Sequence, residues 1–538
     1  MKNKKLELSV ILLLICTVFW FAPMEFFFVN INSFWFDIYD LLPFAVLGTI
    51  VTFGGLFIFF RLLGRFLPRI RAVVICLLFS SILALYLQGN YFIGELGVLD
   101  GTVIEWSLHK KEAILSYTLW GSMLLFGGLL AVLFLKGKQQ IEKIIVTISI
   151  CLILVQIVTL ITAGIFSDGF KKSVSNVPTT NYQFEMSSEE NMIVLLLDSF
   201  DARAMDNVIE DVNCGSILKD FTWFRNTVGG YVYTDLAIPH IISGCQYGEE
   251  ETYKEYVTRA YNESEWLNKL YNNNWRINIY TQSEGPQGEL AVNIDNYEKV
   301  DLTVSSKRRL AKYMYRLVGF RYLPFPLKQY CWFYPDEMED MRNAKDSEVQ
   351  IYDWSNFVFY ENMKEMHVVT SEPSMHLYHL EGTHIPYHIS DKFELVERET
   401  SIEEEAQGVF ILIDEFLSKL KENGIYDNST IVIMADHGYE GYRQSPLFCV
   451  KGKSEKHEFE VTDIPLSYDD LQKAFCYLSE GAAVKDAFSH VPTGERKRTF
   501  WFYDLDYSHN INEQKFVVEE YVTSGNSYED DSVERIEP

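Results

Sequence analysis

The chain has 538 residues, 48% of them hydrophobic, and a formal net charge of −27 at pH 7. The first 166 residues carry a small positive net charge, so the acidity lies in the remainder. A region that acidic repels phosphate backbones, which argues against nucleic acid as a partner. The length allows more than one domain.

Five long apolar segments occupy the first part of the chain. Most reach the ~20 residues that a helix needs to cross a bilayer core. The first is too long for a cleaved signal peptide and has no small-residue cleavage site, so we expect it to remain as an anchor. The sequence therefore predicts a five-helix transmembrane domain at residues 1–166, with spans at Leu6–Val29, Leu41–Leu63, Ala72–Leu87, Ala113–Leu135 and Ile144–Phe166.

Basic residues gather in alternate connections between these segments. The N-terminus and the connections at 61–71 and 136–143 are basic, whereas 30–40 has no Lys or Arg. The positive-inside rule then assigns the N-terminus to the cytoplasm and everything after Phe166 to the opposite side. We expect a multi-pass cell-membrane protein whose C-terminal part is extracellular or periplasmic.

The remaining residues have the pattern of an α/β domain. Residues 167–190 are polar and are predicted to form a linker. From Asn191 onward, short apolar runs alternate with helical stretches, which is typical of a mostly parallel sheet. The domain is predicted at 191–495, and 496–538 is predicted to add two strands, Arg498–Leu505 and Lys515–Thr523, and an acidic tail at Glu529–Asp531. Five cysteines in this part show no zinc-site spacing, and disulfides among them stay open.

Two predicted buried strands end in metal-binding residue types. Asn191–Leu197 is followed by Asp198, and the stretch Thr430–Tyr442 contains a strand followed by Asp436 and His437. Ligands bind outside the carboxyl ends of strands in open α/β sheets. A carboxylate beside an imidazole is suited to a divalent metal. Asp201 is expected to cap the helix that follows instead.

A third predicted strand, Met375–Leu380, leads into a histidine-rich segment. Four of the 11 histidines fall within residues 375–388, including His379 and His384. Histidine serves both in metal binding and in proton transfer near neutral pH. A histidine cluster at a strand end therefore adds to the predicted site.

Thr234 is a candidate nucleophile. It is predicted to begin a short helix that ends near Gly244. A hydroxyl at a helix N-terminus meets backbone N–H groups and a favourable dipole, both useful to an alkoxide or a phosphate. On this stretch alone, the favoured interpretation is that Thr234 only caps this helix. Thr227 is the fallback candidate for the nucleophile.

Residues Ser305–Phe333 are both basic and aromatic. One hypothesis is that they rest on anionic lipid headgroups. The alternative is a solvated helical face.

These features together resemble a known family. Asp198 after a buried strand, Thr234 before a helix closing in Ser-Gly, His-x-x-Gly-Thr-His-x-Pro at 379–386 and Ala-Asp-His-Gly at 435–438 occur in this order. With five membrane spans, the chain resembles the membrane-bound, sulfatase-like branch of the alkaline phosphatase superfamily. That branch includes lipoteichoic acid synthases and lipid A phosphoethanolamine transferases. The resemblance covers nearly the whole chain and implies an alkaline phosphatase/sulfatase-like α/β sandwich.

The resemblance also implies roles for individual residues. One divalent metal ion, zinc or manganese with calcium or magnesium as alternatives, would be held by Asp198, Asp436, His437 and Thr234. Thr234 and His384 would be catalytic, and His379 and His384 would bind substrate. Thr234 would take a phosphoglycerol or phosphoethanolamine group from a phospholipid donor and pass it to a surface glycan or lipid acceptor.

The nucleophile distinguishes the activities within such a superfamily. Sulfatases mature a Cys or Ser within Cys/Ser-x-Pro-x-Arg into formylglycine, and no such segment occurs here. The resemblance therefore favours the transferase. A sulfatase-like hydrolase of phosphodiesters or sulfate esters is the alternative, and a non-catalytic lipid-binding or scaffold protein is a third hypothesis.

Overall fold

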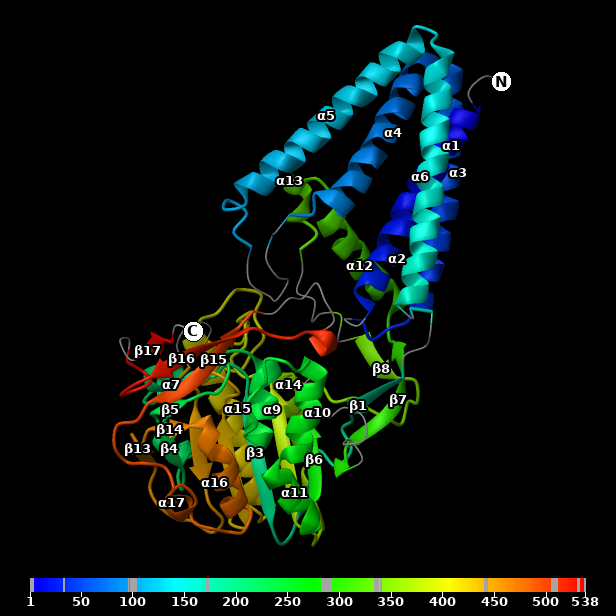
Figure 1. Cartoon of the computed structure of the whole chain (residues 1–538). Coiled ribbons are helices and arrows are strands. Elements are labelled where there is room, and N and C mark those ends of the chain that lie inside the picture. Colours follow the sequence, from blue (N-terminus) through cyan, green and yellow to red (C-terminus); the bar gives the residue numbers. More distant parts are fainter. Residues whose placement is uncertain are drawn as a thin grey trace. The chain divides into compact units, whose positions relative to one another are not determined.

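The computed structural model divides the chain into two compact units (Figure 1). The N-terminal unit comprises residues 1–174 and 301–343, and the α/β unit, later called the catalytic unit, comprises 175–300 and 344–538. The structure describes residues 4–31, 34–94, 96, 104–167, 169–170, 174–281, 293–332, 338, 341–439, 444–504, 511–529 and 533–536. Parts of four predicted stretches lie outside these ranges, namely residues 440–442, Phe333, Leu505, and Asp530 with Asp531.

The N-terminal unit contains the five predicted spans. Five helical segments in the described residues are long and apolar enough to cross a membrane, which confirms the prediction from the sequence. Their outer faces carry large apolar side chains, such as Leu125 at 78% exposed, as expected where acyl chains replace water. The segments are Lys4–Val29, Ile38–Phe66, Pro68–Tyr91, Lys110–Leu135 and Gln140–Phe166.

Each span is built from one or more helical elements. The first passes through a π-helical turn, η1, between two α-helices, and the second begins with a short 3-10 turn, η3. The bounds are α1 Lys4–Ile15, η1 Cys16–Phe21, α2 Ala22–Val29, η3 Ile38–Asp40, α3 Leu42–Phe66, α4 Pro68–Tyr91, α5 Lys110–Leu135 and α6 Gln139–Phe166.

Two further helices, α12 (Lys307–Tyr322) and α13 (Phe325–Lys328), also belong to the N-terminal unit. The sequence had assigned this segment to the domain at 191–495. The apolar face of α12 explains the difference, because Leu310 and Met314 share a core with Met24 and Phe27 of the first span. Because this face is buried against the first span, α12 belongs to the N-terminal unit rather than to the domain that surrounds it in sequence.

The α/β unit is organised around a seven-stranded sheet in the order β13-β4-β12-β11-β3-β10-β6. Only β12 runs against its neighbours, so the sheet is mostly parallel, as predicted. The strands are β3 Asn191–Leu197, β4 Thr222–Phe224, β6 Arg276–Tyr280, β10 Ser374–Leu380, β11 Ser429–Met434, β12 Phe448–Lys451 and β13 Glu460–Thr462.

The sheet is buried on both faces, which is why its strands read as continuous apolar runs. Alternate residues of β3 enter different cores: Val194 packs with one set of helices and Leu195 with another. The first set is α9 Thr234–Ser243, α10 Tyr253–Glu263, α11 Glu265–Asn272, α16 Leu471–Leu478 and α17 Val484–Ala487, several of which cover the sheet in Figure 1. The second is α7 Ala202–Val208, α8 Cys214–Ile217, α14 Asn356–Asn362 and α15 Ile402–Glu422.

Short strands and 3-10 turns complete this unit. The predicted linker contains β1 (Val174–Pro178) and β2 (Glu185–Ser187), and the latter pairs with β9 (His367–Thr370). The C-terminal residues 496–538 add a third strand to the two predicted and pack into the main core through Phe500 and Tyr521. The remaining elements are β5 Thr227–Val228, β7 Tyr297–Val304, β8 Arg342–Ala344, β14 Leu466–Ser467, β15 Arg498–Tyr503, β16 Val518–Thr523, β17 Val533–Arg535, η6 Met363–Glu365, η7 Tyr468–Asp470 and η8 Ile511–Glu513. All eight cysteines lie in described residues and are free.

Candidate metal centre and active site

The candidate site forms where β3, β10 and β11 end. Leu380 of β10 pairs with Leu197 of β3, and Met434 of β11 pairs with Leu196. Because the three strands are parallel neighbours in register, the residues that follow them leave the sheet side by side. Asp198 and Asp436 therefore meet at the edge where open α/β sheets bind ligands.

Asp198 and Asp436 are both buried, at 2% and 0% exposed. Oδ1 of Asp436 accepts hydrogen bonds from the backbone N–H of Ser199 (3.0 Å) and of His437 (2.8 Å). Its other oxygen, Oδ2, is buried and accepts no hydrogen bond within the described part of the chain. A buried carboxylate oxygen in that state is costly unless a cation meets it.

Two histidines surround these carboxylates. Nε2 of His379 lies 3.4 Å from Oδ2 of Asp198, and Nε2 of His437 lies 3.4 Å from Oδ2 of Asp436. Nδ1 of His437 lies 2.7 Å from the carbonyl oxygen of Gly438. A carbonyl can only accept, so Nδ1 carries the proton and Nε2 keeps its lone pair for a ligand.

The histidines determine the ionisation of Asp198. Burial raises the pKa of this carboxyl. When they are protonated, His384 and then His379 and His437 more than offset burial and hold the pKa of Asp198 well below its usual range. Asp198 is therefore ionised near neutral pH and available as a ligand.

Thr234 reaches the same group of atoms from α9. Its Oγ1 lies 3.3 Å from Oδ2 of Asp198 and 3.4 Å from Nε2 of His437. The helix ends as predicted, with Gly244 in the left-handed conformation (φ 68°). The N-cap residue is Tyr233, with no side-chain capping bond, so Thr234 does not serve as a cap. Its hydroxyl is directed to the carboxylate and imidazole.

Thr227, the alternative nucleophile, lies apart from the carboxylates. It is fully buried in β5, and its hydroxyl donates to the carbonyl oxygen of Phe224 at 2.6 Å. That bond occupies the hydroxyl proton inside the core. The geometry therefore favours Thr234 over Thr227.

His384 lies at the edge of the site, in the turn after β10. It is half-buried, and its ring is 5.7 Å from that of Trp354, which also contacts His379 at 5.5 Å. His384 and Asp198 interact electrostatically, as the pKa of Asp198 indicates. Exposure leaves this histidine accessible to a substrate, whereas His379 is 2% exposed.

Three positioning residues were not predicted from the sequence. Ser199 donates its hydroxyl to Oδ1 of Asp198 at 2.7 Å from a left-handed backbone (φ 58°), which is strained for a serine. Gly382 (φ 58°) packs on the backbone of Asp198 so closely that an added Cβ would lie 2.4 Å from its nitrogen. The side-chain amide of Asn356 accepts a hydrogen bond from the backbone N–H of Gly382 at 3.1 Å and donates one to its carbonyl oxygen at 3.0 Å. Only the Gly in the Gly-Thr-His segment gave a sequence signal.

Asp201 has the role predicted for it. It is the N-cap of α7, and its Oδ1 accepts the backbone N–H of Arg203 at 2.9 Å. Its Oδ2 also accepts the backbone N–H of Tyr439 at 3.1 Å, which fixes the turn after His437. Asp201 therefore supports the site without belonging to the metal-capable atoms.

The residues at this edge fit one divalent cation. Ligand atoms of Asp198, His379 and Asp436 all lie within 4.8 Å of one another, and all three residues are buried. His437 adds a lone pair beside them, and oxygen with imidazole nitrogen is a donor set common to zinc and manganese sites. His379 had been expected to support the site or bind substrate. The structure instead groups it with the carboxylates, so it joins Asp198, Asp436 and His437 as a candidate ligand.

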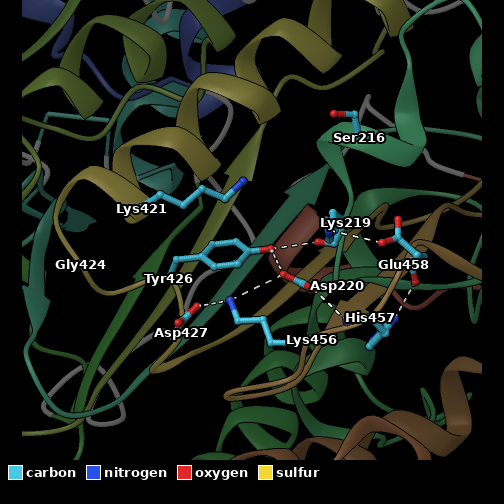
Figure 2. Close-up of a pocket in the computed structure, with 10 residues that line it drawn as sticks. All are labelled: Ser216, Lys219, Asp220, Lys421, Gly424, Tyr426, Asp427, Lys456, His457 and Glu458. Atoms are coloured by element: carbon cyan, nitrogen blue, oxygen red, sulfur yellow. Dashed lines mark hydrogen bonds and ion pairs between the residues drawn. The ribbon is translucent and has the colours of Figure 1, made fainter.

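A second charged cluster forms a cavity of about 670 Å³ around Tyr426 (Figure 2). Here lysines pair with carboxylates: Lys219 with Glu458 at 3.3 Å, and Lys456 with Asp427 and Asp220. Tyr426 and Asp427 precede β11, so the cavity lies at the opposite end of that strand from Asp436. None of the predicted site residues lines it.

A family model agrees with the position of the site in the chain. The model described as "Sulfatase" matches residues 191–466, which begin with β3 and include every residue of the site. No curated protein sequence matches the chain significantly.

The comparison with solved structures finds similar chains at low identity. A protein in the alkaline phosphatase superfamily from Vibrio parahaemolyticus is 11% identical, with a TM-score of 0.38, over 68% of this chain and 85% of its own. The phosphonate monoester hydrolase SpPMH from Silicibacter pomeroyi is 12% identical (TM-score 0.36; 63% and 87%). The PsFucS1 sulfatase from Pseudoalteromonas sp. is 10% identical (TM-score 0.35; 65% and 82%).

Proposed function

Because the chain belongs to the sulfatase family, we propose that it is a membrane-anchored, metal-dependent phosphotransferase. It moves a phosphoglycerol or phosphoethanolamine headgroup from a phospholipid to a cell-surface glycan or lipid acceptor. The observation that carries this proposal is the position of the Thr234 hydroxyl, 3.3 Å from Asp198 and 3.4 Å from His437. A threonine cannot mature into formylglycine, so it favours phospho-transfer over sulfate-ester hydrolysis.

The buried acidic and imidazole groups explain how a threonine could react. A divalent cation at Asp198, Asp436 and His437 would lower the pKa of a nearby hydroxyl and stabilise charge on phosphoryl oxygens. His379 and Ser199 orient Asp198 from two sides. Thr234 is the first residue of α9, and the hydrogen bond from its hydroxyl to the Asp198 carboxylate holds that hydroxyl in place.

The first step forms a phospho-threonine. Oγ1 of Thr234 bonds to phosphorus, and the bond from phosphorus to the diacylglycerol oxygen breaks. The hydroxyl proton of Thr234 passes to solvent, because Asp198, whose pKa lies well below its usual range, is too weak a base to keep it. His384 protonates the leaving oxygen. Diacylglycerol is released, and the headgroup phosphate stays on Thr234.

The second step returns the enzyme to its starting state. An acceptor hydroxyl forms a bond to the same phosphorus, and the bond to Oγ1 of Thr234 breaks. His384, now deprotonated, accepts the proton of the incoming hydroxyl, and Thr234 regains its own. Five apolar spans support a lipid donor, since they hold the enzyme at the membrane that contains it.

The family match favours a second candidate, a hydrolase of phosphodiesters or sulfate esters. Water would then replace the acceptor hydroxyl in the second step. Release of free headgroup at full rate without any acceptor would identify the hydrolase. We further propose that the N-terminus is cytoplasmic and that the catalytic unit is extracellular or periplasmic.

Trapping of the intermediate tests the proposal. The purified full-length protein is loaded with a divalent metal and incubated with phosphatidylglycerol or phosphatidylethanolamine labelled in the headgroup, and its peptides are analysed by mass spectrometry. We expect label on the peptide containing Thr234, none in Thr234→Ala, and retained label in Thr227→Ala. We expect turnover to fall at least about a thousandfold in Thr234→Ala. Label that persists on Thr234→Ala would exclude Thr234 as the nucleophile.

A further inference from the structure

Helix α12 lies in the N-terminal unit as an amphipathic helix packed on the spans. Its end is fixed by Arg321, which pairs with Glu25 at 3.1 Å and donates from Nε to the carbonyl of Gly89 at 2.7 Å. Tyr322 also donates to Glu25. Glu25 is thereby neutralised by a helix distant in sequence, which a carboxylate in an apolar segment requires. The helix is therefore a fixed part of the N-terminal unit.

A groove of about 490 Å³ lies between α12, α3 and the π-helical turn η1. Its apolar lining includes Phe19, Phe44, Leu47 and Val51. Leu47 and Val51 are 56% and 63% exposed, although they belong to a predicted span. From Phe44 to Val51 the helix rises about 10 Å, enough to follow the upper part of an acyl chain. Lipid rather than water covers such a surface.

Two cations of α12, Arg308 and Lys312, line the same groove. They are one helical turn apart and both exposed. The neighbouring Lys307 pairs with Asp40 at 2.9 Å. In the described residues, by contrast, neither Arg308 nor Lys312 forms an ion pair with a carboxylate, and Lys312 contacts only the ring face of Tyr313 as a cation. Among the described residues, the groove therefore combines an apolar wall with two positive charges that lack a counterion.

We propose that this groove binds one anionic phospholipid of the surrounding membrane. The headgroup phosphate lies between Arg308 and Lys312, and an acyl chain follows α3 past Phe44, Leu47 and Val51. An anionic headgroup leaves the attraction to both cations intact, whereas a choline headgroup adds a like charge beside them. This site uses none of the residues of the metal centre and does not depend on the function proposed above.

Native mass spectrometry of the detergent-purified full chain tests the site. Phosphatidylglycerol and phosphatidylcholine are titrated separately, and the lipid-bound fraction is measured for wild type and for Arg308→Gln/Lys312→Gln. We expect wild type to retain one phosphatidylglycerol more strongly than phosphatidylcholine. In the double variant we expect a roughly tenfold loss of phosphatidylglycerol affinity, with phosphatidylcholine unchanged.

Two further variants separate a site from general attraction. Arg65→Gln/Arg69→Gln removes two exposed cations near the other end of α3, and we expect it to leave phosphatidylglycerol binding unchanged. Val51→Trp fills the groove, and we expect it to weaken both lipids while the protein still folds, as judged by circular dichroism. Equal binding of both lipids by wild type, or equal losses in the two double variants, would overturn the proposal.

Discussion

Strand β11 has a charged cluster beyond each of its ends, and the two clusters differ in burial. Beyond Met434, Asp436 is buried with one oxygen that accepts no hydrogen bond among the described residues. Before Ser429, Asp427 has a 64% exposed side chain that pairs with Lys456 (Figure 2). The first cluster retains buried negative charge beside imidazoles, whereas the second is neutralised by lysines in water.

The comparison shows why cavity size is a poor guide to function here. The cavity around Tyr426 is open and its charges are already satisfied, so it offers no ligand an advantage over water. The metal centre is compact, but its carboxylates need a cation to offset burial. Uncompensated charge, rather than volume, distinguishes the functional end of the strand.

The largest effect expected from this comparison is on metal binding. Asp436→Asn removes the charge of a buried ligand, and we expect affinity for zinc or manganese to fall at least about a hundredfold. The metal-induced rise in melting temperature should disappear with it. Asp427→Asn is the matched control, and calorimetric titration should find it unchanged. If Asp436→Asn bound the metal with wild-type affinity, the proposed difference between the two ends of β11 would be wrong.

Lys451 lies beside the cluster that precedes β11, the neutral end of the strand. Its replacement tests how much this end contributes to the free energy of unfolding. It is fully buried beneath Tyr426 and donates to the carbonyl oxygens of Tyr426, Ser429 and Gly452 at 2.9, 3.0 and 3.1 Å. Lys451→Met leaves these carbonyls unsatisfied, so we expect a loss of about 1–3 kcal/mol in the free energy of unfolding, with metal affinity unchanged. Lys473→Met, at an exposed position of α16, is the control in thermal melts.

The pH dependence of Lys451 has a defined sign. Burial lowers the pKa of its ammonium from 10.5 to about 8. Between these values the unfolded chain binds the additional proton, so the contribution to the free energy of unfolding rises as pH increases from 8 to 10.5. Lys451→Met should lack this rise. A parallel pH profile for variant and wild type would contradict the assignment.

Glu405 shows what burial does to a carboxyl whose pKa is not lowered by a histidine side chain. Burial raises its pKa from 4.5 to about 7, although it accepts the backbone N–H of His388 and, at 2.8 Å, of Ile389. The folded state binds the additional proton between pH 4.5 and 7, so the free energy of unfolding should fall as pH rises through this window. We expect Glu405→Gln to flatten that fall by about 1–3 kcal/mol. Glu422→Gln, on the same helix, should leave the fall in the free energy of unfolding between pH 4.5 and 7 unchanged.

The sequence predicted the parts of the site that follow from strand pattern alone. Buried parallel strands must end at a common edge, so Asp198, Asp436 and His437 could be brought together from their positions after apolar runs. The helix from Thr234 to Gly244 followed from its boundary signals, whereas the choice of Thr234 as the nucleophile came from the family resemblance. The five spans followed from length and hydropathy.

The sequence could not indicate what depends on contacts between distant residues. The direction of His379 is set by the register of β10 against β3, and the left-handed backbone of Ser199 by its bonds to two aspartates. The grouping of α12 with the spans depends on the partner of Glu25. In the sequence, Lys451 has the pattern of an ordinary surface lysine, and only the folded structure shows that it is buried.

The smallest effect tests the exposed pairs of the neutral end. The Lys456 and Asp427 side chains are 56% and 64% exposed, so their pair is screened by water and salt. Asp220 has an 8% exposed side chain and lies farther away, at 3.8 Å from Nζ of Lys456. We expect Lys456→Gln to lower the free energy of unfolding by less than about 1 kcal/mol, and by less still in 1 M salt. Chemical denaturation at both salt concentrations measures this. A loss above about 2 kcal/mol would mean that these charges are shielded from solvent, and the contrast between the two ends of β11 would then rest on metal affinity alone.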